Sequence, residues 1–99
     1  MVGIDLTNVS RFEKITFKTI ERFLSKEEII TFKQTENKNK FLATRWAIKE
    51  AIFKADNSEY SFNKINIEKK NNIYVYKNFI ISTSYEKDTI IAFVIKKEN

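Results

Sequence analysis

The stretch Phe41-Leu-Ala-Thr-Arg-Trp-Ala-Ile-Lys-Glu-Ala-Ile-Phe-Lys-Ala55 contains no Gly, Pro or Asn, and it predicts one uninterrupted helix. At helical spacing its apolar side chains gather on one wide face, which is expected to be buried: Phe41, Leu42, Trp46, Ile48, Ile52, Phe53 and Ala55. Trp46, Glu50 and Lys54 follow at steps of four residues and form an adjoining edge. Glu50 and Lys54 are therefore either a solvent-exposed helix pair or part of a functional site.

The composition is that of a small globular protein. The 99 residues, 42% of them hydrophobic and 31% charged, suffice for a single domain spanning residues 1–99 with a modest core. No apolar run approaches the roughly 18 residues that mark a membrane span. The first residues, Met1 to Asp5, lack the basic region and apolar core of a secretion signal. We therefore expect a cytoplasmic protein without a membrane partner.

Cysteine and histidine are both absent from the sequence. This removes disulfides, thiol nucleophiles, thiolate metal sites and any mechanism that needs a histidine base within the chain. A bound metal would have to be held by oxygen ligands, which favours Mg²⁺ over Zn²⁺. A catalytic base would be a carboxylate, a Lys, a Tyr or a metal-bound water.

The formal net charge of +5 predicts attraction to an anionic partner. Nucleic acid, a phosphate-rich small molecule and an acidic protein all satisfy it, so the charge alone does not choose among them.

The first residues predict a short strand. Val2, Ile4 and Leu6 alternate with Gly3 and Asp5, and we expect this apolar set to face the core. Asp is disfavoured inside strands, so its position there needs a reason. It either caps the following turn or has a functional role.

Two helices are predicted before the central one. The first runs from Val9 to about Phe23, capped by Asn8. Its polar side is basic, and it either is simply solvated or receives an acidic partner: Arg11, Lys14, Lys18 and Arg22. Ser25 and Glu28 have the spacing of a capping box, which starts a second helix through Phe32.

The second half of the chain predicts an antiparallel meander. After a loop at residues 56–59, strands are expected at residues 62–68, 73–76, 79–85 and 89–95, separated by polar turns. The fold class is thus α+β, with an N-terminal strand and three helices followed by the meander. No Gly-rich phosphate loop is present in the sequence, which excludes nucleotide binding of the P-loop or Rossmann type.

Three separated pieces together resemble one family. They are Gly3-Ile-Asp-Leu6, the Phe41 to Ala55 helix, and Ser82-Thr-Ser-Tyr85 followed by Ile91-Ala-Phe-Val94. In this order and spacing they resemble the holo-acyl-carrier-protein synthases, the bacterial single-domain phosphopantetheinyl transferases, over nearly the whole chain. The resemblance implies the phosphopantetheinyl transferase fold and a homotrimer with active sites at subunit interfaces. It also implies Mg²⁺-dependent transfer of the 4'-phosphopantetheine arm of coenzyme A to a serine of acyl carrier protein, in fatty acid and lipid biosynthesis.

The resemblance gives catalytic roles to three residues. Asp5 and Glu50 match the Mg²⁺ ligands, which would also explain an Asp inside a strand. Lys54, one turn beyond Glu50, would face the coenzyme A pyrophosphate and offset charge on the leaving group. With no histidine available, a metal-bound water or a carboxylate would accept the serine proton, and we favour the water.

The resemblance also implies binding roles. Arg45, Ser84 and Tyr85, together with Lys54, would contact coenzyme A. Arg11 and Arg22 would dock the acidic carrier protein, which gives the basic helix face a partner.

The sequence departs from the family in two places. Residues 56–60 stand where the family has a Gly-rich turn, so the loop beside coenzyme A must be built differently. Tyr85 stands where the family has a His, and it can donate a hydrogen bond but cannot be cationic.

Two alternative functions remain open at this point. One is a small basic RNA-binding module in which Tyr74, Tyr76 and Phe79 stack bases. The other is an inert relative that keeps the fold and only binds carrier protein.

Overall fold

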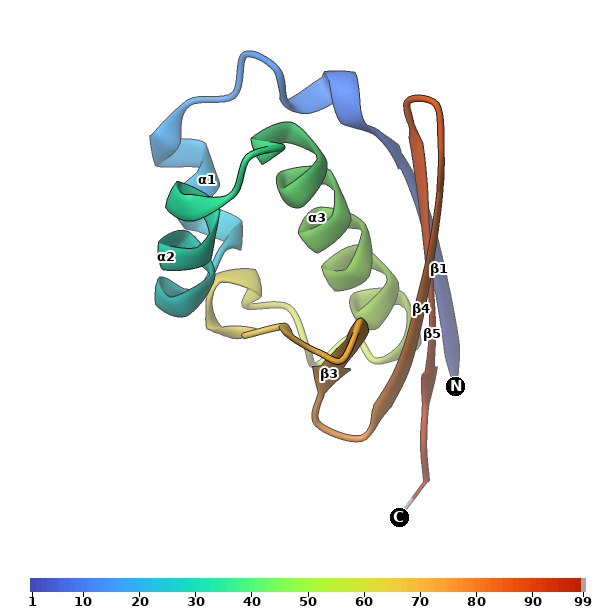
Figure 1. The fold of residues 1–99 in the computed structure, drawn as a ribbon. Coiled ribbons are helices and arrows are strands. Elements are labelled where there is room, and N and C mark those ends of the chain that lie inside the picture. Colours follow the sequence, from blue (N-terminus) through green and yellow to red (C-terminus); the bar gives the residue numbers. More distant parts are fainter. Residues whose placement is uncertain (99) are drawn as a thin grey trace.

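Helix α3 (Lys38–Ala55) lies at the centre of the computed structural model, which describes residues 1–98 (Figure 1). A sheet covers one side of α3, and two shorter helices cover the other. The elements in chain order are β1 Val2–Asn8, the 3₁₀ helix η1 Val9–Phe12, α1 Phe17–Phe23, α2 Lys26–Gln34, α3, the 3₁₀ helix η2 Phe62–Lys64, β2 Glu68–Lys70, β3 Ile73–Tyr76, β4 Phe79–Glu86 and β5 Thr89–Lys96. The α+β class is confirmed.

The sheet has the strand order β1-β5-β4-β3-β2, and every neighbouring pair is antiparallel. The predicted meander is therefore confirmed for β3, β4 and β5, whereas β2 lies largely where a turn was expected. Asn71 and Asn72 form the β2–β3 turn with φ of 51° and 64°, the left-handed conformation that Asn tolerates. The first strand pairs with the last, from Val2 opposite Ile95 to Asn8 opposite Thr89.

The long central helix is confirmed, and it begins three residues before the predicted start. The side chain of Asn37 accepts a hydrogen bond from Lys40 N and caps it. Small residues let α3 approach the sheet closely. A Cβ on Gly3 would lie only 1.8 Å from Ala51 O, so β1 packs backbone against backbone on α3.

An aromatic cluster joins α3 to the other elements. The ring centroid of Trp46 lies 5.3 Å from that of Phe23 and 5.7 Å from that of Phe62, both edge to face. Phe12 completes the cluster from η1, with its ring centroid 6.5 Å from that of Trp46. These aromatic contacts help to hold η1, α1 and η2 on α3.

Two predicted elements are wrong. The single helix from Val9 to Phe23 is broken into η1 and α1, because Thr16 is extended and accepts a hydrogen bond from Thr19 N as a new N-cap. The strand at residues 62–68 is also wrong, since residues 62–64 form η2 and pairing begins only at Glu68. In between, Ile67 N donates to Glu28 Oε2 and so has no strand partner.

The burial of the first strand is the reverse of the prediction. Gly3 and Thr7 are buried against the helix side, whereas Val2, Ile4 and Leu6 are 57–61% exposed. The close contact with Ala51 decides this, because only the glycine-bearing face of β1 can lie on α3.

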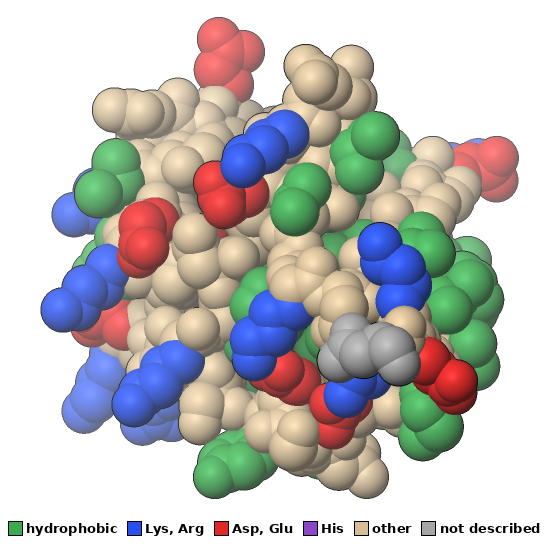
Figure 2. Space-filling model, turned by 90° about the horizontal axis from the view of Figure 1, so that it is seen from below, with side chains coloured by type: hydrophobic (Ala, Val, Ile, Leu, Met, Phe, Trp, Pro, Cys, Tyr) green, Lys and Arg blue, Asp and Glu red, His purple; other side chains and the backbone are tan. Residues whose placement is uncertain are grey.

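The exposed side of the sheet forms what we call the outer sheet face. Its large apolar side chains are Val2, Ile4, Leu6, Val75, Ile80, Phe93 and Ile95. Figure 2 shows hydrophobic side chains along the right-hand side, where the sheet stands, and Lys and Arg side chains on the opposite side, toward α1 and α2. Among residues 1–98, no helix is long and apolar enough to cross a membrane.

Candidate active site

Asp5 on β1 and Glu50 on α3 lie together because of the Gly3 contact. Gly3 and Asp5 share one face of β1, so the strand that touches Ala51 also brings Asp5 against α3. Lys54 Nζ lies 3.2 Å from Asp5 Oδ1 and donates to Ile4 O at 3.0 Å. These three side chains, Asp5, Glu50 and Lys54, form what we call the carboxylate cluster.

The electrostatics of the carboxylate cluster favour a bound cation. Partial burial, followed by the negative charge of Asp5, raises the pKa of Glu50, while Lys54 and Arg11 oppose the rise. Burial thus disfavours the charged form of Glu50, and Asp5 adds a repulsion that Lys54 and Arg11 oppose. A divalent cation with oxygen ligands fits this arrangement.

Within residues 1–98, no group of three or more Asp, Glu, His or Cys side chains is placed to coordinate a metal ion. Any cation held by Asp5 and Glu50 would take its other ligands from substrate or water. Asp5 and Lys54 line a hollow of about 290 Å³ with Ile4, Leu6 and Ile91. This hollow lies along β1, the edge strand, where Asp5 and Lys54 meet side chains of the outer sheet face.

Arg11 lies beside this cluster. Its guanidinium stands 5.3 Å from the centroid of the Trp46 ring, and Nη1 is 3.4 Å from Thr7 Oγ1. Arg22 lies on a different element, exposed in the last turn of α1. The break between η1 and α1 thus separates the two arginines that the sequence placed on one helix.

The other predicted binding residues lie away from the carboxylate cluster. Arg45 is buried between rings, with its guanidinium carbon 4.4 Å from the Phe41 centroid and 5.1 Å from that of Tyr74. Its Nε is 3.4 Å from Glu28 Oε2, as an ion pair without hydrogen-bond alignment. Burial lowers the pKa of Arg45, with Glu28 opposing the change.

Ser84 and Tyr85 are adjacent on β4 and so lie on opposite faces of the sheet. The Tyr85 ring lies under Lys40 of α3, whose Nζ is 4.1 Å from the ring centroid. Ser84 is in register with Ile91 toward the outer sheet face. Within one chain, the structure brings Asp5, Glu50 and Lys54 together but keeps Arg45, Ser84 and Tyr85 apart from them.

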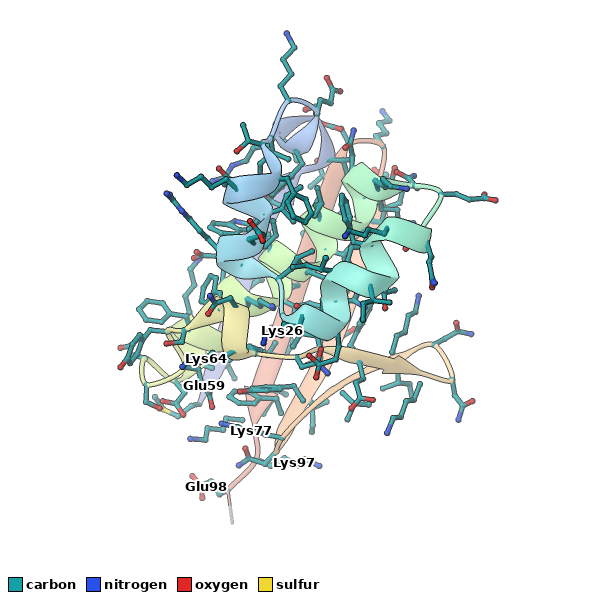
Figure 3. The ribbon with its side chains drawn as sticks, turned by 90° about the vertical axis from the view of Figure 1, so that its left-hand side faces the viewer. Lys26, Glu59, Lys64, Lys77, Lys97 and Glu98 are labelled. Carbon is teal, nitrogen blue, oxygen red and sulfur yellow. The ribbon has the colours of Figure 1, made fainter. Side chains whose placement is uncertain are left out.

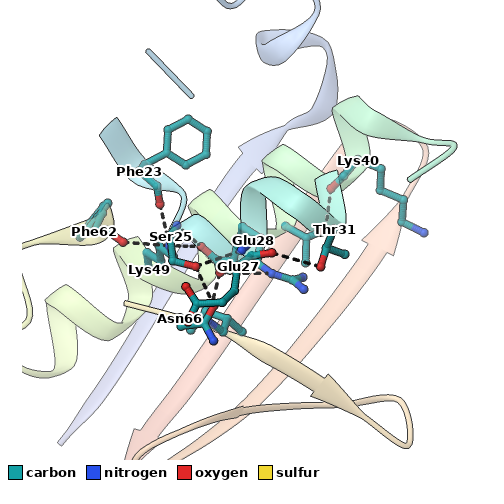
Figure 4. A network of polar contacts seen from close by, with 12 residues as sticks. Phe23, Ser25, Glu27, Glu28, Thr31, Lys40, Lys49, Phe62 and Asn66 are labelled. Atoms are coloured by element: carbon teal, nitrogen blue, oxygen red, sulfur yellow. Dashed lines mark hydrogen bonds and ion pairs between the residues drawn. The ribbon is translucent and has the colours of Figure 1, made fainter. Parts of the chain in front are cut away.

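Sequence reasoning missed a second group of charges. Lys49 is completely buried, and its Nζ donates to Phe23 O at 2.6 Å, to Phe62 O at 2.9 Å and to Glu28 (Figure 4). Glu28 also accepts from Ser25 N and Ile67 N. We call Glu28, Arg45 and Lys49 the buried network.

Burial lowers the pKa of Lys49 to about 8, although Glu28 raises it in opposition. One signal was present in the sequence, since Lys49 lies one residue after Ile48 and three before Ile52, next to the apolar line of the helix. Its partner is 21 residues away, which spacing does not reveal.

The loop at residues 56–60 is held by polar contacts where the family has glycines. Asp56 accepts from Ser58 N at 3.0 Å, from Ser58 Oγ at 2.7 Å and from Lys96, and these contacts lower its pKa to about 2. Glu59 accepts from Tyr76 OH and Lys77 Nζ, both at 2.8 Å (Figure 3). The loop is therefore anchored to β3 and β5.

The aromatics of the RNA-binding alternative serve the fold. Tyr76 stacks on Phe79 with 6.0 Å between ring centroids, and Phe79 is buried. Tyr74 lies against the Arg45 guanidinium. These rings do not form an exposed platform for bases.

Comparison with known proteins identifies relatives over the whole chain. The 4'-phosphopantetheinyl transferase superfamily model matches residues 1–94. A holo-[acyl-carrier-protein] synthase of Mycoplasma mobile is 55% identical over 98 residues, covering 99% of this chain and 90% of the relative. That of Mycoplasmopsis pulmonis is 49% identical over 96 residues, covering 97% and 89%.

Solved structures agree with the sequence relatives. The holo-(acyl-carrier-protein) synthase of Bacillus anthracis in complex with CoA (3',5'-ADP) has a TM-score of 0.81 at 30% identity, covering 94% of this chain and 91% of that one. The Helicobacter pylori synthase in complex with coenzyme A has a TM-score of 0.78 at 28% identity, covering 98% and 100%.

Proposed function

The chain belongs to the 4'-phosphopantetheinyl transferase superfamily, among the holo-acyl-carrier-protein synthases, and we propose that it transfers the 4'-phosphopantetheine arm of coenzyme A to a serine of an acyl carrier protein. We propose a Mg²⁺-dependent, cytoplasmic reaction that supplies fatty acid and lipid biosynthesis. The observation that carries the proposal is the carboxylate cluster, in which Asp5 from β1 meets Glu50 and Lys54 from α3.

Asp5 and Glu50 would hold the metal. When bound, Mg²⁺ supplies positive charge that neutralises pyrophosphate oxygens and the charge developing on the leaving group. The raised pKa of Glu50, caused first by partial burial and then by Asp5, supports this assignment, because a neighbouring cation would favour the charged carboxylate against both effects.

Lys54 would bind the pyrophosphate beside the metal site. Its ammonium is half-exposed, and it uses two donors on Asp5 and Ile4 O, which leaves a third for a phosphate oxygen. In the reaction, the serine Oγ bonds to phosphorus, and its proton would pass to a water molecule at the carboxylate cluster. The pyrophosphate P–O bond breaks, and adenosine 3',5'-bisphosphate leaves with charge that Lys54 stabilises.

The remainder of coenzyme A would be bound by Arg45, Ser84, Tyr85 and Lys54. A hollow of about 220 Å³ supports this, since Lys40, Thr44, Tyr74, Ser84 and Tyr85 are among its lining residues. Because the Lys40 ammonium lies over the Tyr85 ring, a positive charge is present where the family has a His.

We propose a homotrimer with each active site between two subunits. Two observations support it: the outer sheet face exposes a contiguous apolar surface, and the coenzyme A residues lie away from the carboxylate cluster of the same chain. A neighbouring subunit would cover the first and complete the second.

The trimer has two tests. Ile80→Lys places a charge on the outer sheet face, so sedimentation should show monomers that keep the wild-type circular dichroism. Refolding Glu50→Gln together with Tyr85→Ala should restore activity that neither variant has alone, because mixed trimers contain sites with both halves intact. A lack of recovery would mean that each chain builds its own site.

Arg11 and Arg22 would dock the carrier protein. Both are exposed, and Lys14 and Lys18 add positive charge between them along the chain. Each Arg→Ala change should raise KM for the carrier protein more than KM for coenzyme A, and added salt should weaken the docking. Equal changes in both constants would argue against docking.

The decisive experiment is mass spectrometry of an apo acyl carrier protein incubated with this protein, coenzyme A and Mg²⁺. The carrier should gain the phosphopantetheine mass on its serine. Chelation of the metal should abolish the gain, and Asp5→Asn should abolish it with the metal present. A folded wild-type protein that binds the carrier but adds no mass would be an inert relative.

A further inference from the structure

The start of η1 is tied to the turn between β4 and β5. Ser10 N donates to Asp88 Oδ1 at 2.9 Å, and Ser10 Oγ donates to Asp88 Oδ2 at 2.6 Å. Val9 N donates to the backbone oxygen of Asp88 at 2.7 Å. Asn8, at the N-cap position, makes no side-chain cap bond, so a carboxylate 78 residues away caps η1 in its place.

This contact matters because η1 cannot hold itself. It has four residues, a single turn, and a turn of that length has no stability of its own. Its exposed residue Arg11 reaches Trp46 and the neighbourhood of Glu50. The place of Arg11 beside the carboxylate cluster therefore depends on what fixes η1.

The chemistry of Asp88 points to the same role. A carboxylate near a surface that receives an acidic partner repels that partner, so the position of Asp88 calls for a compensating role. Both side-chain oxygens of Asp88 accept hydrogen bonds from Ser10. The acid is thereby committed to the fold of η1.

We propose that Asp88 is a positioning residue for carrier-protein recognition: by capping η1 it presents Arg11 to the acidic partner beside the carboxylate cluster. This inference rests on the docking role proposed above for Arg11. The partner chemistry is an acidic protein surface next to the serine to be modified.

Asp88→Ala tests the inference by whether KM for the carrier protein rises or falls. Loss of positioning should raise KM for the carrier protein on the order of tenfold, with KM for coenzyme A unchanged. Removal of a negative charge alone would lower KM for an acidic carrier. Glu86→Ala is the matched control, because it removes the same charge from the same hairpin and Glu86 has no hydrogen bond to η1 among the described residues. It should leave KM for the carrier unchanged or lower it.

Further variants should raise KM for the carrier protein by different amounts, according to how many hydrogen bonds between Asp88 and Ser10 they keep. Asp88→Asn keeps an acceptor for Ser10 N and offers an amide donor to Ser10 Oγ, so it should restore most of the wild-type constant. Ser10→Ala should cause a smaller rise than Asp88→Ala. Arg11→Ala combined with Asp88→Ala should be no worse than Arg11→Ala alone.

Trp46 gives a readout without turnover. It is the sole Trp of the sequence, and the Arg11 guanidinium lies over it. Asp88→Ala should increase quenching of its fluorescence by acrylamide, with the thermal transition retained. Unchanged quenching, or equal shifts in both Michaelis constants, overturns the positioning role. Absence of transfer by the wild-type protein would instead overturn the proposed function, while the Trp46 measurement would still decide whether Asp88 fixes Arg11.

Discussion

Lys49 and Glu50 are neighbours in the sequence, and α3 delivers them to two charged regions with opposite properties. In the buried network, Lys49 uses all three donors, on Phe23 O, Phe62 O and Glu28. In the carboxylate cluster, Glu50 faces a second acid, and Lys54 is half-exposed. The same residue types thus form a buried, hydrogen-bonded contact around Lys49 and a partly exposed cluster around Glu50.

The difference lies in whether donors and acceptors are matched inside the protein. The buried Lys49 has no donor left for a ligand, and removing either Lys49 or Glu28 would leave the other charge buried without its main partner. An unmatched, partly exposed cluster costs some stability and gains the ability to bind. The variants that follow test whether the two regions differ in this way, beginning with the largest expected effect.

Asp5→Asn and Glu50→Gln should remove activity without removing the fold. Each should lower kcat by about 1000-fold or more, or roughly 4 kcal/mol, because each removes one of the two carboxylates proposed to hold the metal. The free energy of unfolding should change by less than about 1 kcal/mol, because each substitution removes both the repulsion between the two acids and an attraction to the partly exposed Lys54. Mass spectrometry of the carrier measures the first effect, and retained Mg²⁺-dependent transfer in either variant would sink the assignment.

Lys49→Met should produce the reverse pattern. It leaves Glu28 buried without its cation, so the free energy of unfolding should fall by about 3–5 kcal/mol. Lys54→Met is the matched control, because the same substitution at a half-exposed position should change stability by less than about 1 kcal/mol while lowering activity. Urea unfolding measures the loss of stability in each variant. Equal losses would show that the two lysines do not differ in their contribution to the fold.

Gly3→Ala should damage the carboxylate cluster through packing alone. The added methyl group would overlap Ala51 O, so β1 must move away from α3 and take Asp5 with it. We expect a loss of about 1–3 kcal/mol in unfolding free energy together with reduced kcat. Lys70→Ala, at an exposed position of β2, should change neither quantity; urea unfolding and mass spectrometry of the carrier measure both.

Asp56 and Lys96 supply a surface pair with the smallest expected effect. Because the pKa of Asp56 is lowered to about 2, its carboxylate stabilises the fold above its unfolded pKa near 3.9, and this contribution is lost as pH falls through about 2. Asp56→Asn should therefore flatten the acid limb of stability between pH 4 and pH 2, measured by urea midpoints. An acid limb identical to that of the wild type would show that the loop contacts contribute nothing.

Sequence patterns found the parts of this molecule that depend on local spacing. The capping box of Ser25 and Glu28 was predicted from two positions, and both of its hydrogen bonds are present. The strands β3, β4 and β5 followed from alternation and turn residues. The carboxylate cluster required the family resemblance, since nothing local connects Asp5 to Glu50.

What the patterns missed depends on contacts distant in the sequence. Glu28 fits a capping box whether or not Lys49 binds it from the next helix. The apolar set of Val2, Ile4 and Leu6 fits a core face equally well as an exposed one, and the Gly3 contact with α3 decides between them. Both facts emerge only when the elements are packed together.

The pairing of β1 with β5 also governs when the site can form. The strand that carries Asp5 finds its partner only in residues 89–96, and Lys96 N donates to Met1 O at 2.8 Å. During synthesis on the ribosome, α3 with Glu50 and Lys54 can form before β5 has been made, and until then β1 has no strand to pair with. Because closing so long a loop is slow, Asp5 and Glu50 should be among the last side chains of the nascent chain to come together.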